Sequence, residues 1–299
     1  MKDVIGRVRP INWNEAPELE LDVWNKLTQN FWLPEKIALS NDLTAWRNMT
    51  DIEKDVTMKV FAGLTLLDTV QGSVGMISLI PDAQNPFEEA ILQNMCFMEA
   101  VHAKSYSSIF STLSNTNDIN EAFRWSEENT YLNIKVDKIQ SIYESVAEGL
   151  TADKRKIASV FLESGLFFSG FFWPIYLASR GKLTNTNDII MLILRDESVH
   201  GYIIGYWFQR NLAQHSPEDQ QELKDFTLDL LFDLYENEMR YTESLYYSLG
   251  ITEEVKNFIR YNFNKALQNL GYDPIFSGDQ IKVPASIMAS LSPDGGSNH

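Results

Sequence analysis

Two copies of the pattern Glu-x-x-His constrain what this chain can fold into. Glu99 with His102 forms the first copy and Glu197 with His200 the second, so two of the four histidines in 299 residues belong to the pattern. Residues three positions apart lie on the same face of a helix, so each copy can offer a carboxylate and an imidazole to one metal ion. One copy is weak evidence. Two copies in separate long apolar stretches indicate a dinuclear metal site carried by helices.

The composition predicts a globular protein that does not bind nucleic acid. A hydrophobic content of 44% supports a sizeable core, and 25 basic against 41 acidic residues give a formal net charge of -16. That charge would repel nucleic acid and anionic membrane surfaces. The N-terminus has no apolar signal-peptide core, and the longest apolar run, near Gly170 to Ala178, is far shorter than the about 20 residues that span a membrane. We therefore expect no membrane association and a cytoplasmic location.

Long helices separated by short polar breaks are expected along the chain, with no strands and no internal repeat. Thr50 and Glu53 predict a capping box for a helix over about 51–78, and Asn85-Pro86 opens the next, over about 86–112. Shorter helical pieces are expected around 118–146, and further helices over about 153–180, 188–214, 216–249 and 252–270. Pro174 is expected to kink the helix over 153–180, because proline lacks the backbone N–H donor.

The fold class predicted is all-α, with a ferritin-like four-helix bundle as the core and additional flanking helices. We expect one domain over 1–299, with an N-terminal arm over about 1–20 and an irregular segment over about 272–299. The four helices near 51–78, 86–112, 153–180 and 188–214 are each long enough to form the bundle.

The central turns of these four helices carry six candidate metal ligands: Asp68, Glu99, His102, Glu163, Glu197 and His200. Ferritin-like di-iron and di-manganese bundles take one carboxylate from each of two helices and a Glu-x-x-His from each of the other two. Four carboxylates neutralise two divalent ions, whereas without the ions the like charges would shift one another's pKa. Oxygen and imidazole donors without thiolate suit iron or manganese better than structural zinc or calcium. We therefore predict two manganese or two iron ions.

Taken singly, each of these acids could lie on a solvated helix face. Asp68, Glu163 and Glu197 are instead flanked by strongly apolar residues, and acids in such surroundings need partners. The single cysteine, Cys96, allows no disulfide within the chain and no thiolate metal site.

The assembled residues resemble those of the small, radical-generating subunit of class Ib ribonucleotide reductase, over nearly the whole chain. The resemblance implies an enzyme subunit that is active only with a large subunit, which uses the radical to reduce ribonucleotides to deoxyribonucleotides. It implies that Tyr106, in EAVHAKSY, is oxidised to a tyrosyl radical. Phe167, Phe171 and Ile193 would line the radical pocket, as their family counterparts do, although each is equally expected as a core residue.

The same resemblance implies how the radical leaves and how the cofactor is activated. Trp32, in QNFWLPEKI, and Asp196 would form with His102 the route towards the large subunit. Asp196 also suits a carboxylate that accepts the second N–H of a metal-bound histidine. Ser164 resembles the polar position that lines a channel for the oxidant delivered by a flavodoxin-like activase. The family further implies a homodimer. Because the sequence ends at SPDGGSNH, without the family's C-terminal tail that anchors the large subunit, we expect a truncated chain that assembles its cofactor but does not support turnover.

Three other functions are compatible with the residues alone. A di-iron oxidase or oxygenase of the same fold would need an open pocket at the metals, which Tyr106, Phe167 and Phe171 are expected to fill. A ferritin-like storage protein would assemble into a shell and would need neither Trp32 nor Asp196. A helical interaction protein without metal would leave the paired Glu-x-x-His motifs unexplained.

Overall fold

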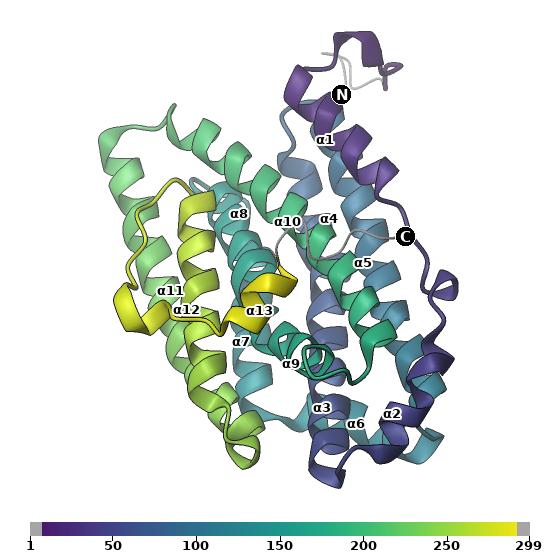
Figure 1. The fold of residues 1–299 in the computed structure, drawn as a ribbon. Coiled ribbons are helices and arrows are strands. Elements are labelled where there is room, and N and C mark those ends of the chain that lie inside the picture. The colour runs from purple at the N-terminus through teal and green to yellow at the C-terminus, as the bar shows by residue number, and fades with distance from the viewer. Residues whose placement is uncertain (1–7, 292–299) are drawn as a thin grey trace.

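The computed structural model describes residues 8–291, and within that range the chain forms helices and no β-sheet. Figure 1 shows the long helices lying side by side, with α1 at one end of the molecule. The α-helices are, in chain order, α1 Glu18–Gln29, α2 Leu43–Asn48, α3 Asp51–Val70, α4 Met76–Leu79, α5 Pro86–Leu113, α6 Thr116–Glu128, α7 Thr130–Tyr143, α8 Thr151–Phe161, α9 Phe168–Ala178, α10 Thr184–Leu212, α11 Pro217–Tyr246, α12 Thr252–Asn269 and α13 Ala285–Ser290. The predicted all-α class is confirmed.

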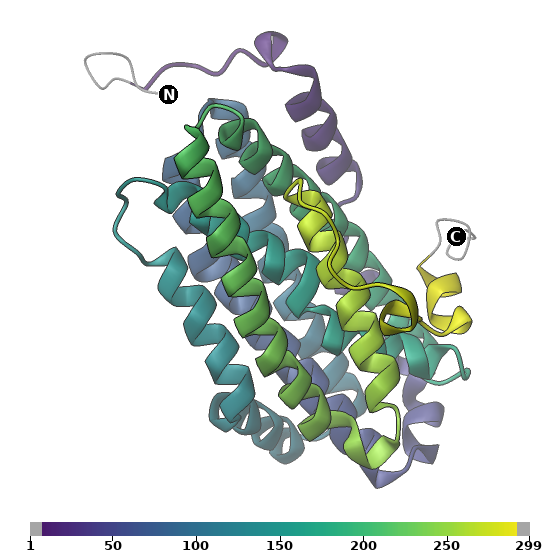
Figure 2. The same cartoon turned by 90° about the vertical axis from the view of Figure 1, so that its left-hand side faces the viewer.

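The core of the fold is a four-helix bundle in which two members contain a π-helical turn. α3 continues into α4 through Gln71–Gly75, and α8 continues into α9 through Leu162–Leu166. These two composite helices pack with α5 and α10: α3 contacts α5, and α10 contacts α8 and α9. α7, α11 and α12 flank the bundle, and Figure 2 shows α11 and α12 running along its side. The predicted ferritin-like bundle with flanking helices is therefore confirmed.

Several helix starts follow the capping signals of the sequence. At α3, the Thr50 hydroxyl accepts a hydrogen bond from the Glu53 backbone N–H at 3.2 Å, and the Glu53 carboxylate accepts one from the Thr50 N–H at 3.0 Å. At α5, the Asn85 side chain accepts hydrogen bonds from two first-turn N–H groups, and Pro86 needs no donor partner there. These contacts set where the helices that carry the central acids begin.

α10 begins at Thr184, four residues before the expected start at Asp188, because its cap comes from elsewhere in the chain. The carboxylate of Asp42 accepts hydrogen bonds from the backbone N–H of Asn185 at 3.2 Å and of Thr186 at 2.6 Å. A cap supplied from more than a hundred residues away leaves no local signal, so the sequence could not reveal it.

The C-terminal end of the described chain contains more helix than expected. At the other end, α1 begins at Glu18, close to the predicted end of the N-terminal arm over about 1–20, and packs against α5 and α10. Within the segment predicted as irregular, a 3₁₀ turn at Gly278–Ile281 and the helix α13 lie against α12 and α9 respectively. Residues 1–7 and 292–299, which belong to these two predictions, lie outside the described residues.

Two composite helices are long and apolar enough to cross a membrane, judged by length and composition alone. They are Asp51–Asp82 and Thr151–Ala178, and 61% and 89% of their most apolar windows lie buried inside the structure. The longest continuous apolar run of the sequence, near Gly170 to Ala178, is far shorter, because both of these windows also contain polar residues. Both helices belong to the bundle core, and such burial is typical of core helices of globular proteins.

Candidate metal centre

Six side chains converge at the centre of the bundle from four directions. Asp68 comes from α3, Glu99 and His102 from α5, Glu163 from the π-helical turn before α9, and Glu197 and His200 from α10. None of the six is more than 1% exposed. The structure therefore brings together every metal ligand that the sequence predicted.

The six residues form two overlapping groups that could each hold one metal ion. In the first group, Asp68, Glu99, His102 and Glu197 offer ligand atoms within 4.8 Å of one another, and Glu99, Glu163, Glu197 and His200 do the same in the second group. We call these the His102 position and the His200 position. Glu99 and Glu197 belong to both, which is the arrangement expected of carboxylates that bridge two ions.

The two imidazoles are placed in the same way. Nδ1 of His102 lies 3.0 Å from Glu197 Oε1, 3.4 Å from Glu99 Oε2 and 3.8 Å from Asp68 Oδ1. Nδ1 of His200 lies 3.0 Å from Glu197 Oε2, 3.1 Å from Glu99 Oε1 and 3.6 Å from Glu163 Oε2. Each histidine therefore turns one nitrogen towards three carboxylates, as a metal ligand would.

The cluster contains buried polar atoms that no other part of the described chain satisfies. They are both carboxylate oxygens of Asp68 and of Glu99, Oε2 of Glu163, Oε1 of Glu197, Nδ1 of His102 and Nε2 of His200. Native proteins rarely leave so many buried polar atoms unpaired, because each carries a desolvation penalty. Two divalent ions would satisfy nearly all of them, and four oxygen and two nitrogen donors suit manganese or iron. The residues present thus fit a dinuclear metal site.

Without metal, the carboxylates perturb one another strongly. Burial raises the pKa of Asp68, and the neighbouring carboxylate of Glu99 raises it further. Burial likewise raises the pKa of Glu163, assisted by Glu197. For Glu197 burial acts in the same direction, but the neighbouring Glu163 and His102 outweigh it, so its pKa is lowered. The cluster therefore retains protons unless cations replace them.

The same carboxylates also shift the pKa values of the two histidines. Burial disfavours their charged form, but the surrounding carboxylates, Glu197 first for His102 and Glu163 first for His200, outweigh burial and raise the pKa of both imidazoles. Metal binding requires neutral imidazole, so an ion must displace a proton from each ring.

Trp32 and Asp196 lie directly behind His102. Asp196 Oδ2 is 3.1 Å from His102 Nε2 and accepts a hydrogen bond from the Trp32 indole N–H at 2.8 Å. The indole ring also stacks on the imidazole, with ring centroids 5.9 Å apart. The structure therefore joins the three residues that the sequence assigned to radical transfer into one hydrogen-bonded line, and their role in transfer stays a prediction.

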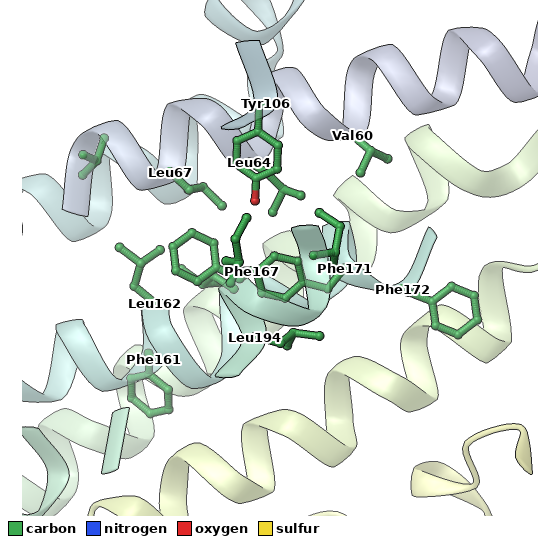
Figure 3. Packing of buried hydrophobic residues seen from close by; sticks show 14 of the residues in the cluster. Val60, Leu64, Leu67, Tyr106, Phe161, Leu162, Phe167, Phe171, Phe172 and Leu194 are labelled. Carbon is green, nitrogen blue, oxygen red and sulfur yellow. The ribbon is translucent and has the colours of Figure 1, made fainter. Parts of the chain in front are cut away.

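Tyr106 is fully buried, and its hydroxyl has no hydrogen-bond partner among the described residues. Figure 3 shows its oxygen pointing towards the side chains of Leu64, Phe167 and Phe171. Burial raises the pKa of the phenol, and the carboxylate of Asp68 raises it further, so the phenol stays protonated next to the acids. Ile193 is also completely buried, on α10.

Ser164 follows Glu163 in the π-helical turn and is 8% exposed. Its hydroxyl accepts a hydrogen bond from the Asn269 amide at 3.1 Å. A Cβ on Gly201 would lie 2.2 Å from the Ser164 oxygen, so α10 passes this turn closely only because residue 201 is glycine. These contacts do not test the predicted oxidant channel, which stays a prediction.

Sequence reasoning missed Gln71 and Tyr143. The Gln71 amide donates a hydrogen bond to Glu163 Oε1 at 2.6 Å, and the Tyr143 hydroxyl donates one to the Gln71 carbonyl oxygen at 2.6 Å. The one local signal was that Gln71 lies three residues after Asp68, on the same helix face.

Comparisons with known proteins agree with this geometry. The family model described as "Ribonucleotide reductase, small chain" matches residues 10–283. The ribonucleoside-diphosphate reductase subunit beta nrdF2 of Mycobacterium tuberculosis is 55% identical over 297 residues, which cover 99% of this chain and 90% of the relative. The ribonucleoside-diphosphate reductase 2 subunit beta of Escherichia coli is 54% identical over 296 residues, covering 99% and 92%. The crystal structure of dimanganese(II)-NrdF of Streptococcus sanguinis matches with a TM-score of 0.90 and 50% identity, covering 96% of this chain and 100% of that chain.

Proposed function

The chain belongs to the ribonucleotide reductase small-chain family, and on that premise we propose that its six clustered residues bind two metal ions and that Tyr106 carries the radical. It is the radical-generating subunit of a class Ib ribonucleoside-diphosphate reductase. The observation that supports the residue assignment best is the pair of overlapping ligand groups that share Glu99 and Glu197, with a buried phenol beside them.

Each residue has a defined task in this proposal. Held by these six residues and oxidised by O2 or superoxide, a metal pair would supply the oxidising power for the loss of one electron and one proton from Tyr106. Tyr106 must release both, because its apolar pocket disfavours a charged ring. Phe167, Phe171 and Ile193 exclude water and reductants from the phenol. Asp196 accepts the second N–H of His102 and so fixes the orientation of that imidazole.

We propose that the radical equivalent leaves through His102, Asp196 and Trp32 towards the large subunit, which uses it to reduce ribonucleotides. The support is the continuous contact from Nε2 of His102 through Asp196 to the Trp32 indole, at 3.1 and 2.8 Å. Ser164 is proposed to line the path of the oxidant.

The partners and the cofactor follow from the family. We propose a homodimer that works with the large subunit and is activated by a flavodoxin-like protein. The relative from Streptococcus sanguinis is a dimanganese(II) protein, which favours manganese here, while the donor set accepts iron equally. The formal net charge of -16 supports a protein without nucleic-acid or membrane partners, located in the cytoplasm.

Replacing Tyr106 by phenylalanine tests the radical assignment. The variant should bind two ions per chain, because the phenol is not a ligand, and should show no tyrosyl signal in electron paramagnetic resonance after oxidation. Tyr246→Phe is the matched control, since Tyr246 is equally buried and its hydroxyl donates to the Ser169 carbonyl instead. A tyrosyl signal that survives in Tyr106→Phe would assign the radical to another residue.

A further inference from the structure

The bundle's two departures from α-helical geometry meet each other at the metal centre. Gln71 opens the π-helical turn Gln71–Gly75, and Glu163 lies in the π-helical turn Leu162–Leu166. The contact between the two turns is the hydrogen bond from the Gln71 amide to Glu163 Oε1. π-helical turns are rare and occur frequently at functional sites, so two of them meeting at one ligand calls for an explanation.

Gln71 is held in a single orientation. Its amide nitrogen donates to Glu163 Oε1 and to the Ser159 hydroxyl at 2.9 Å, and its carbonyl oxygen accepts from the Tyr143 hydroxyl. Flipping the amide would place its carbonyl oxygen against the Glu163 carboxylate and lose that hydrogen bond, because a carboxylate can only accept whereas the two hydroxyls can also reverse their roles. Gln71, Tyr143 and Ser159 are each at most 2% exposed, so water does not compete for these contacts.

Gly75, at the end of the π-helical turn Gln71–Gly75, leaves space for the Gln71 amide and the Tyr143 ring. A Cβ on Gly75 would lie 2.3 Å from the Gln71 carbonyl oxygen and 2.8 Å from the Tyr143 ring. Only glycine at residue 75 therefore leaves room for the amide and the phenol together.

Gln71 and Tyr143 are connected to a candidate ligand of only one of the two metal positions. Glu163 belongs to the His200 position and not to the His102 position. Gln71 occupies Oε1 of Glu163, while Oε2 has no hydrogen-bond partner and lies 3.6 Å from His200 Nδ1. One oxygen is thus held by the protein, and the other would be free to bind an ion.

We propose that Gln71 and Tyr143 are positioning residues that orient Glu163 and thereby set the metal affinity of the His200 position separately from that of the His102 position. The inference rests on the proposed role of Glu163 as a ligand. Removing a hydrogen-bond partner of a metal ligand typically weakens binding about 10- to 100-fold, and here the loss should fall on one ion of the pair.

The test is Mn(II) binding to the metal-free protein, followed by the electron paramagnetic resonance of free Mn(II). Gln71→Met removes both amide donors but keeps the length of the side chain. The expected result is one ion per chain bound as in the unchanged protein and a second ion bound about 10- to 100-fold more weakly. Crystals grown with limiting Mn(II) should show anomalous density at the His102 position alone.

Two further variants test the same contact. Tyr143→Phe is the milder one, because it keeps the buried ring and removes only the hydroxyl that fixes the amide. Gly75→Ala displaces the amide itself. Both should lower the affinity for the second ion. Asn237→Leu is the control, because the Asn237 amide is also buried but donates to the Tyr131 carbonyl, at 2.8 Å. It should lower the unfolding temperature and leave both affinities unchanged.

The outcomes separate this inference from the proposed function. The unchanged protein should bind two ions. If it does, and Gln71→Met lowers the affinity for both ions equally or for neither, then Gln71 does not position Glu163 for one site and the inference is wrong. If the unchanged protein fails to bind two ions, the ligand set itself is wrong.

Discussion

At the scale of single residues, His102 shows how one side chain serves two surroundings. Its Nδ1 faces the carboxylates of the metal centre, and its Nε2 faces Asp196 Oδ2, which also accepts the hydrogen bond from Trp32. The hydrogen bond to Asp196 fixes which nitrogen is free to bind metal and makes that nitrogen a better donor. Asp196 would therefore support metal binding even without radical transfer.

Asp196→Asn separates these two roles. Without the carboxylate, His102 should bind metal more weakly, so the His102 position should lose affinity about 10-fold or more while the His200 position is retained. Mn(II) titration of the metal-free protein measures this. Trp32→Phe is the control, because it removes the indole donor and leaves the contact between Asp196 and His102 in place. Equal affinity in Asp196→Asn and the unchanged protein would contradict the metal-binding role.

The six candidate ligands could be predicted from the sequence because their evidence is local: two Glu-x-x-His spacings, and single acids within apolar helices. Gln71 and Tyr143 could not be predicted. Their contacts cross 92 and 72 residues of chain, and a glutamine and a tyrosine on a helix carry no pattern that tells a ligand's partner from an ordinary core residue.

At the scale of elements, helix starts were predictable where the cap is local. The sequence predicts the Thr50 capping box and the Asn85 cap correctly. It predicts the start of α10 four residues too late, because Asp42 supplies the cap. The π-helical turns were not predictable either. The hydrophobic pattern runs through them unchanged, and they depend on close packing, as at Gly72, where a Cβ would lie 2.9 Å from the Cβ of Glu99.

Removing the distant cap should destabilise the protein more than removing a local one. Asp42→Ala leaves the N–H of Thr186 and the hydroxyl of the same residue without a partner in a buried place, which should lower the free energy of unfolding by about 1–3 kcal/mol. Thr50→Ala, at the exposed start of α3, should lower it by about 1 kcal/mol. Urea unfolding of both metal-free variants compares them, and a smaller loss for Asp42→Ala would contradict the assignment of the cap.

At the scale of the whole molecule, the metal centre places four carboxylates at full burial among side chains that are mostly apolar. Asp68 and Glu163 have raised pKa values in the folded metal-free protein, above ordinary values of 3.8 and 4.5. Between the ordinary and the raised pKa, the folded state holds protons that the unfolded chain has released. The stability of the metal-free protein therefore falls as pH rises through that window.

His102 and His200 contribute with the same sign, from their ordinary pKa of 6.5 upwards, because their folded pKa is raised as well. Glu197, whose pKa is lowered, has the opposite sign, but only below its ordinary value of 4.5. Metal ions replace the retained protons, so the metal-bound protein escapes most of this loss.

The unfolding temperatures of manganese-bound and chelator-treated protein should therefore diverge with pH. We expect a larger difference at about pH 8 than at about pH 5.5, since protons compete with the ions at the lower pH. Calorimetry at constant ionic strength measures both forms. A difference that stays constant or narrows towards pH 8 would contradict the assigned pKa directions.

The burial of Tyr106 also has a consequence for how its proposed radical would meet reductants. A phenol enclosed by Leu64, Phe167 and Phe171, with no exposed surface, cannot be touched by a dissolved electron donor. A reductant in solution would therefore quench the radical proposed for Tyr106 only through the protein matrix, or after the helices part to let a small molecule in. The packing that encloses the phenol would thus lengthen the lifetime of its oxidised form.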